Sequence, residues 1–216
     1  MIKNLIFDFD GTLVDTSPLI LQTMSRTIER MQLPSVSTER CKATIGLRLE
    51  DVPATLWPDI PGIGHTFAST YREIFDRLKR PLSVNCYPGV IETLHALQSE
   101  DLRMAIASSR SHKSLEEYIE LFNLSDCFDM IIGGDDVHHG KPHPEPVLTI
   151  INALSWEPSQ TLTIGDAPVD IFMGRAAKTL TCAVTYGNST PDQLQSAQPD
   201  FTISNFPALS SIILSP

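Results

Sequence analysis

Two aspartates near the beginning of the chain, Asp8 and Asp10, have the type and spacing that most directly suggest chemistry. The apolar run from Leu5 to Phe7 precedes them and Gly11 follows them. This run is too short for a helix, so it predicts a buried strand with Asp8 at its carboxyl end, where open α/β sheets bind ligands. Side chains two residues apart on an extended chain point the same way. The two carboxylates would therefore repel each other, which predicts a bound divalent cation or an acid–base role.

Other polar side chains follow later apolar runs, and each also has an ordinary structural explanation. Ser108 can hold a phosphate oxygen or simply cap the helix that follows it. Lys141 is followed by two prolines that fix the backbone and would aim a point charge, although a lone lysine is usually a solvated surface residue. Asp166 and Asp170 can bind a metal, or they can satisfy the N-terminus of a helix.

Together these residues form the motifs of a known family. The sequence DFDGTLVD at residues 8–15 resembles motif I (DxDGTLxD) of the haloacid dehalogenase-like (HAD) phosphohydrolases. Ser108 matches motif II, GKPHPE at residues 140–145 matches motif III, and GDAPVD at residues 165–170 matches motif IV. The motifs occur in the family's order, each after an expected strand, and the resemblance covers nearly the whole chain.

The resemblance implies a covalent mechanism with four catalytic residues. Asp8 would attack phosphorus and form an aspartyl-phosphate. Asp10 would donate a proton to the leaving oxygen and later accept one from water. Ser108 and Lys141 would hold the oxygens of the phosphoryl group.

The balance of charge at this site predicts a metal. Four aspartates and a phosphate dianion would meet at one edge of the sheet, and Lys141 would return a single positive charge. Like charges this close cannot all stay ionised without a divalent cation, and all-oxygen ligation beside a phosphate indicates Mg²⁺. The resemblance assigns the ion to the Asp8 carboxylate, the Asp10 backbone carbonyl and Asp166. Asp170 would stand beside them, orienting water or supporting Lys141.

Substrate choice is expected to depend on the segment after the first strand. Residues 16–81 predict helices and no convincing strand, and the family's C1 cap occupies the same place. In its loop, Arg48 stands where many members carry proline, and we interpret it as a contact for a substrate carboxylate or second phosphate, although a single exposed arginine is most often a surface charge. We also expect Gly11, Ser109 and Arg110 to contact substrate, with Arg110 at the rim of the site. We interpret His138 and His139 as loop residues.

The rest of the chain alternates apolar runs with helical patterns of about ten residues. Such alternation predicts an α/β fold with a doubly wound parallel sheet. The resemblance makes this a Rossmann-like HAD core formed by residues 1–15 and 82–216, with residues 16–81 as the cap domain. Further strands are expected at residues 102–107, 128–132, 161–164, 180–184 and 201–203. Relatives usually end the motif IV helix with glycine where this chain has Lys178, which predicts a small loss of stability.

Composition excludes several other classes of protein. The chain has 216 residues and a formal net charge of −10, which argues against a nucleic-acid partner. It contains no apolar run of the roughly 20 residues that a membrane span requires, and it does not begin like a secretory signal. The four cysteines are scattered, which predicts reduced thiols in a cytoplasmic protein. The expected partner is a small phosphorylated metabolite.

Several functions share these motifs. We interpret the chain as a Mg²⁺-dependent phosphatase that resembles the phosphoglycolate phosphatase branch. A phosphosugar mutase like β-phosphoglucomutase and an inorganic pyrophosphatase remain alternatives. A dehalogenase is disfavoured because those enzymes lack the acid–base carboxylate that Asp10 provides, and a non-catalytic binding module is disfavoured because no motif residue is missing. The sequence indicates neither the substrate nor whether the chain is a monomer or a homodimer.

Overall fold

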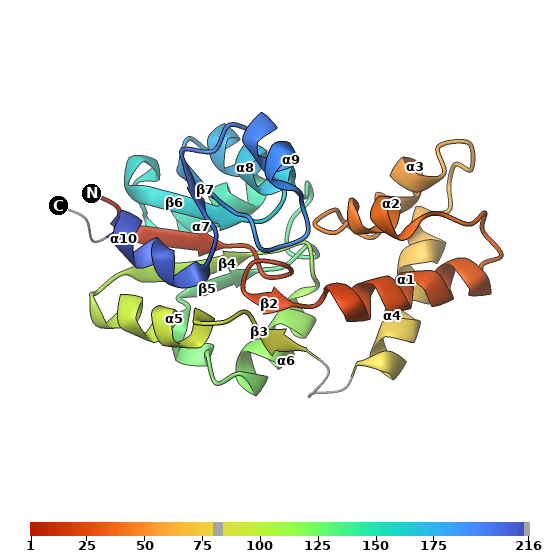
Figure 1. Ribbon diagram of the computed structural model, residues 1–216, viewed down its shortest axis with the longest axis horizontal. Coiled ribbons are helices and arrows are strands. Elements are labelled where there is room, and N and C mark those ends of the chain that lie inside the picture. The colour runs from red at the N-terminus through yellow and green to blue at the C-terminus, as the bar shows by residue number, and fades with distance from the viewer. Residues whose placement is uncertain (80–83, 214–216) are drawn as a thin grey trace.

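A six-stranded parallel sheet forms the centre of the protein in its computed structural model, which describes residues 1–79 and 84–213 (Figure 1). In spatial order the strands are β5 (Met130–Ile132), β4 (Arg103–Ala107), β1 (Asn4–Phe7), β6 (Thr161–Gly165), β7 (Leu180–Val184) and β8 (Phe201–Ile203). Every pairing within this sheet is parallel. The predicted α/β fold is therefore confirmed, and the motif-bearing strands β4, β1 and β6 are direct neighbours.

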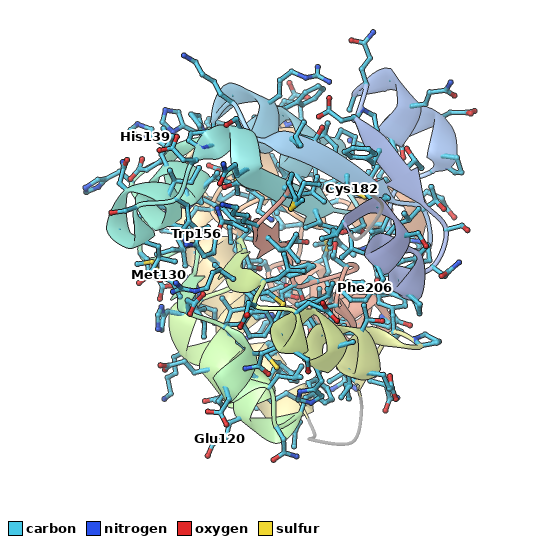
Figure 2. The ribbon with its side chains drawn as sticks, turned by 90° about the vertical axis from the view of Figure 1, so that its left-hand side faces the viewer. Glu120, Met130, His139, Trp156, Cys182 and Phe206 are labelled. Carbon is cyan, nitrogen blue, oxygen red and sulfur yellow. The ribbon has the colours of Figure 1, made fainter. Side chains whose placement is uncertain are left out.

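Helices cover both faces of the sheet, because alternate side chains of each strand point to opposite faces. Leu5 and Phe7 of β1 pack in one cluster with α5 (Val90–Ser99) and α6 (His112–Leu121). Ile6 packs in a second cluster with α7 (Glu145–Leu154) and α8 (Pro168–Ala176). Figure 2, which views the protein from the end away from its helical segment, shows these two pairs of helices on opposite sides of the strands. The sheet is thus doubly wound, as predicted.

Four helices lie beyond the carboxyl end of β1 (Figure 1). They are α1 (Ser17–Arg30), α2 (Thr38–Lys42), α3 (Val52–Leu56) and α4 (Gly64–Leu78). Residues 16–79 contain no strand, in agreement with the sequence interpretation. The predicted boundary between residues 81 and 82 lies outside the described part of the chain, and the division into core and cap stays a prediction.

A short antiparallel ribbon, which the sequence analysis missed, joins the two ends of the helical segment. It pairs β2 (Val14–Asp15) with β3 (Asn85–Cys86). Two-residue strands show no periodicity, so nothing in the sequence pattern marks them. The ribbon brings the chain leaving β1 beside the chain that returns from α4.

Two short helices follow the later strands of the sheet. The short helices α9 (Pro191–Ser196) and α10 (Leu209–Ile213) were not predicted from the sequence. The N-cap position of α1 belongs to Thr16, and Ser17 is the first helical residue. All four cysteines are free thiols. Within residues 1–79 and 84–213, no helix has the length and apolar character needed to cross a bilayer.

Lys178, the residue that replaces the usual glycine after α8, has a left-handed backbone with φ of 64°. Its side chain is exposed, so the change Lys178→Gly removes the conformational penalty without opening a cavity. We expect this variant to raise the free energy of unfolding by about 1 kcal/mol, measured by denaturant titration. Lys178→Ala is the matched control, because it removes the same side chain but keeps the Cβ that makes the conformation unfavourable. An equal gain in both variants would contradict a backbone cause.

Candidate active site

Three polar residues meet at the carboxyl edge of the sheet because they follow neighbouring strands. Asp8 follows β1, Ser108 follows β4 and Asp166 follows β6. All three residues are buried, with at most 4% of their surface exposed. Ligands bind at this edge in open α/β sheets, so the position agrees with a functional role.

Lys141 joins this group from the loop that precedes α7. Its Nζ lies 2.5 Å from Asp8 Oδ1 and 2.7 Å from Asp170 Oδ1, and the residue is 4% exposed. Burial alone would lower the pKa of Lys141, but the Asp170 and Asp8 carboxylates raise it above its usual value. The alternative of a solvated surface lysine is therefore excluded, since a buried ammonium persists only where it is paired.

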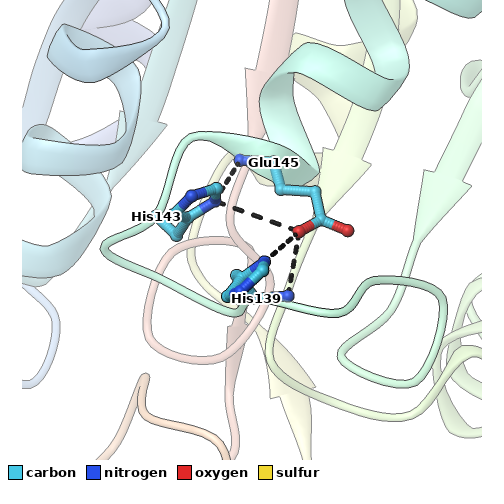
Figure 3. A group of neighbouring side chains, drawn as sticks. All are labelled: His139, His143 and Glu145. Carbon is cyan, nitrogen blue, oxygen red and sulfur yellow. Dashed lines mark hydrogen bonds and ion pairs between the residues drawn. The ribbon is translucent and has the colours of Figure 1, made fainter.

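Glu145, at the start of α7, shapes the loop that carries Lys141 (Figure 3). Its carboxylate accepts hydrogen bonds from the backbone N–H groups of His138 at 2.8 Å and His139 at 2.9 Å, and it also contacts His139 Nδ1 at 2.8 Å. The backbone N–H of His138 and the side chain of His139 lower the pKa of Glu145 to about 2. His139, His143 and Glu145 have donor atoms close enough to hold a metal ion, but both histidines are exposed and lie outside the buried edge.

The buried acidic group suits a divalent cation. Oxygens of Asp8, Asp166 and Asp170 lie within 4.8 Å of one another. Burial raises the pKa of the Asp8 carboxyl well above its usual range, although the Lys141 ammonium opposes this shift. Burial and the charge of Asp170 raise the pKa of Asp166 to about 7. Three carboxylates thus face one ammonium, and the excess negative charge favours a cation with oxygen ligands.

The partners of Asp170 agree with a supporting role rather than direct ligation. One oxygen accepts from Lys141 Nζ at 2.7 Å, and the other accepts from the backbone N–H of Ala167 at 3.0 Å. The second contact also satisfies the N-terminus of α8, so the helix-capping explanation applies to Asp170 as well. Asp170 therefore fixes both Lys141 and the helix that follows Asp166.

Asn188 is a site residue that the sequence analysis missed. Its backbone N–H donates to Asp166 Oδ2 at 2.6 Å, and its Nδ2 lies 3.5 Å from the backbone carbonyl oxygen of Asp10. Its side chain also accepts a hydrogen bond from the Ser17 hydroxyl. Asn188 stands four residues after the end of β7 on an irregular loop, where only its place beyond a strand signals a functional residue.

Gly11, expected to contact substrate, allows the chain to approach Asp166 closely. Its φ is 93°, and a Cβ there would lie 2.2 Å from both Asp166 Oδ2 and Asn188 Nδ2. A side chain at residue 11 would therefore push apart the acidic group and the loop that supports it. Thr12 adds a hydrogen bond of 3.2 Å from its hydroxyl to Asp166 Oδ1.

The Asp10 carboxylate has partners different from those of Asp8. It accepts from the Thr16 hydroxyl at 2.5 Å and from Arg110, whose Nη2 and Nε lie 2.6 and 3.1 Å from its two oxygens. Both aspartates nevertheless line the same cavity. We expected Arg110 at the rim of the site. Its side chain is instead buried in the wall beside Asp10 and is 7% exposed.

A cavity of about 400 Å³ lies between this edge and the helical segment. The sheet side contributes Asp8, Asp10, Ser108, Ser109 and Arg110, and the helical segment contributes residues 44–47 together with Leu49, Tyr71, Arg72, Phe75, Asp76 and Lys79. The Ser109 hydroxyl donates to the Gly46 carbonyl at 2.6 Å and joins the two walls. The volume suits a small metabolite.

Arg48 is placed differently from the sequence interpretation. It does not line the cavity; instead its Nη1 donates to the His138 carbonyl at 2.7 Å. Its aliphatic stem lies over Gly140, where a Cβ would come within 2.4 Å of Arg48 Cδ. Arg48 therefore connects the loop before α3 to the loop that carries Lys141, and this geometry gives no support to a substrate contact.

Comparison with known proteins identifies the family. The profile of haloacid dehalogenase-like hydrolases matches residues 5–184. The chain belongs to this family. A pyrophosphatase named PpaX from Oceanobacillus iheyensis is 32% identical over 98% of this chain and 97% of its own length. A phosphoglycolate phosphatase from Aquifex aeolicus is 31% identical over 93% of this chain and 91% of its own length.

A solved structure supports the same assignment. A Bacteroides fragilis protein described as haloacid dehalogenase-like superposes with a TM-score of 0.91 at 30% identity, covering 97% of this chain and 100% of that chain. The HAD-like family predicted from the motifs is thus confirmed, and the chain is an enzyme of that family, a phosphatase.

Proposed function

We propose that this HAD phosphatase hydrolyses a small phosphorylated metabolite through an aspartyl-phosphate on Asp8, with Mg²⁺ as its cofactor. One observation carries the proposal: Asp8 is buried at the end of β1, bonded to Lys141, and still lines a cavity of about 400 Å³. A buried carboxylate that faces both a fixed cation and a ligand-sized cavity is placed to act as a nucleophile.

In the proposed first step, the Asp8 carboxylate attacks phosphorus, the ester P–O bond breaks, and Asp10 gives a proton to the leaving oxygen. The phosphoryl group then remains on Asp8 as an acyl phosphate. In the second step Asp10 takes a proton from water, which attacks the same phosphorus. The P–O bond to Asp8 then breaks, which releases inorganic phosphate and restores the Asp8 carboxylate. Lys141 and Ser108 hold the phosphoryl oxygens, and the Lys141 charge lies beside the reacting carboxylate throughout.

Mg²⁺ would be held by the carboxylates of Asp8 and Asp166 and by the backbone carbonyl of Asp10. When bound, the ion supplies positive charge that stabilises the transferring phosphoryl group. The excess of buried carboxylate over ammonium supports this part of the proposal. Asp170 supports Lys141 from outside the ligand set.

Residues 16–81 are proposed to act as a cap over the site. The cavity is lined by both the sheet edge and the helical segment, and the β2–β3 ribbon at the base of that segment provides a narrow connection. Movement about such a connection would admit substrate and then exclude water during phosphoryl transfer.

The decisive experiment is a panel of phosphorylated compounds assayed with Mg²⁺ by released phosphate. Phosphoglycolate, pyrophosphate, hexose phosphates and nucleoside monophosphates test the main alternatives. Accumulation of an isomeric sugar phosphate would indicate a mutase, and preference for pyrophosphate would indicate a pyrophosphatase. Activity that survives thorough chelation would count against the metal.

Mg²⁺ binding is expected to tighten as pH rises towards and just above 7. Below about pH 7 the metal-free folded protein favours a protonated Asp166, because burial and the Asp170 charge raise its pKa to about 7 from 3.8 in the unfolded chain. A raised pKa of this kind contributes stability below pH 3.8 that is lost as pH rises through about 7, where the ionised group is repelled by its neighbours. Mg²⁺ removes that repulsion by replacing the proton. Because Asp8, the other proposed carboxylate ligand, also has a raised pKa, the Mg²⁺ affinity should rise by about tenfold or more for each pH unit below these pKa values.

The measurement for this prediction is the rise in melting temperature on adding Mg²⁺ to chelator-treated protein at several pH values. We expect a larger rise at pH 8 than at pH 6, and a rise strongly reduced at both values in Asp166→Asn. Asp126→Asn, which changes an aspartate away from the acidic group, is the control and should respond as the unchanged protein does. A response that does not vary with pH would contradict the competition between Mg²⁺ and a proton.

A further inference from the structure

Arg110 is buried more deeply than a substrate contact at the rim requires. Its side chain is 7% exposed and that of its partner Asp10 is 12% exposed. Nη2 and Nε together contact both Asp10 carboxylate oxygens, and Nη1 donates to the Ser114 hydroxyl at 3.0 Å. A planar guanidinium that binds a carboxylate through two nitrogens fixes its direction as well as its charge.

Three aromatic rings surround the same guanidinium. Its central carbon lies 5.7 Å from the ring centroid of Phe9, 5.0 Å from Phe75 and 5.1 Å from Tyr118. Each distance is within the range of a cation–π contact. Arg110 therefore has little freedom to move, and the Asp10 carboxylate bonded to it has equally little.

The three rings come from different parts of the molecule. Phe9 lies between Asp8 and Asp10, Tyr118 belongs to α6, and Phe75 belongs to α4 of the helical segment. The place of the guanidinium thus depends on where α4 lies relative to the sheet. The other hydrogen-bond partner of the Asp10 carboxylate, Thr16, precedes α1 of the same segment.

We propose that Arg110 is a positioning residue for Asp10: bound by the aromatic ring cluster of Phe9, Phe75 and Tyr118, it holds the Asp10 carboxylate in place for proton transfer and links that place to the helical segment. This inference rests on the proposed function, because it assigns Asp10 the proton transfers. It differs from the sequence interpretation, in which Arg110 binds substrate. It also gives Phe75 a role that neither its apolar character nor its place on α4 indicated.

Leaving-group dependence separates the two roles of Arg110. An alkyl phosphate has a poor leaving group that needs a proton, whereas 4-nitrophenyl phosphate has a good one that does not. If Arg110 positions Asp10, the change Arg110→Met should lower kcat for the alkyl ester by about 10²-fold and kcat for the nitrophenyl ester by less than about fivefold. Asp10→Asn should show the same pattern. If Arg110 binds substrate, KM should rise for both esters alike.

Two further variants test the geometry. Arg110→Lys keeps the charge but cannot bind the carboxylate through two nitrogens, so it should retain most of the defect on the alkyl ester. Phe75→Leu should shift the leaving-group dependence in the same direction, with a smaller effect. Phe67→Leu is the matched control, because Phe67 is a buried aromatic residue of α4 that contacts Trp57 and Tyr71 instead. It should leave the ratio of the two rates unchanged.

The outcomes keep this inference apart from the proposed function. If the unchanged protein releases no phosphate from these esters or from any compound of the panel, the proposed function fails and the assignment to Arg110 fails with it. If the unchanged protein is active but Arg110→Met lowers both rates equally, or Arg110→Lys is fully active, only the positioning role is overturned. A crystal structure of Arg110→Met gives a readout independent of activity. We expect the Asp10 carboxylate to leave its place beside Thr16, and an unmoved carboxylate would overturn the inference.

Discussion

Asp8→Asn is expected to lower phosphate release by about 10⁴-fold or more while the protein stays folded. The amide has the shape of the carboxylate and can still accept a hydrogen bond from Lys141, but it cannot attack phosphorus. Because burial raises the pKa of Asp8, the folded protein already disfavours the charge at this position. Removing that charge should therefore leave the melting temperature unchanged or raise it.

Phosphate release with Mg²⁺ and thermal unfolding are the two measurements for this variant. Asp59→Asn is the control, because it makes the same chemical change at an exposed residue of the turn between α3 and α4. Mass spectrometry of rapidly quenched protein should detect the added phosphoryl group on Asp8 in the unchanged enzyme and not in Asp8→Asn. Phosphate release from Asp8→Asn close to that of the unchanged protein would refute the covalent mechanism.

Much of the fold and the acidic group of the site could be predicted from the sequence, because each motif follows an apolar run. Asp8, Ser108 and Asp166 end such runs, and the parallel arrangement of the strands then places them at one edge. Lys141 required more than periodicity, since its loop has no regular pattern. Its assignment from sequence depended on the prolines that follow it and on the motif they complete.

Side-chain partners across long separations were the part that the sequence did not indicate. Arg110 and Asp10 are 100 positions apart, and the Arg110 guanidinium packs over the ring of Phe75 from α4. Asn188 lies on an irregular loop, where neither periodicity nor charge marks it. Arg48 was assigned to substrate because an arginine suits an anion, but its direction is set by packing over Gly140 and by the His138 carbonyl. Such contacts follow from tertiary packing, which local patterns do not encode.

Lys141→Met is expected to produce the largest combined loss of stability and activity. Methionine nearly matches the length of the side chain but leaves Asp8 and Asp170 buried beside Asp166 without their ammonium. Removing one partner from a buried ion pair typically costs about 3–5 kcal/mol, so the metal-free variant should unfold at much lower denaturant. Added Mg²⁺ should restore part of this loss, because it neutralises the same carboxylates.

Activity should not recover with stability. The ammonium stabilises charge on the transferring phosphoryl group, and removing one such donor typically costs about 10²–10³-fold in rate. Lys3→Met, at an exposed position, is the control for loss of a positive charge and should affect neither property. Phosphate release from Lys141→Met that remained near normal would contradict the role given to Lys141.

The double variant Lys141→Met with Asp170→Asn separates the two roles of the lysine. Asp170 bonds Lys141 and the backbone N–H of Ala167, so the asparagine removes an excess charge while its side-chain oxygen can still accept from Ala167. We expect the double variant to be more stable than Lys141→Met without Mg²⁺, because fewer uncompensated carboxylates remain buried. We expect its phosphate release to stay as low as that of the single variant. Recovery of both stability and phosphate release would mean that Lys141 acts only by stabilising the fold. A failure to recover stability would mean that Asp170 is not the carboxylate whose charge Lys141 compensates.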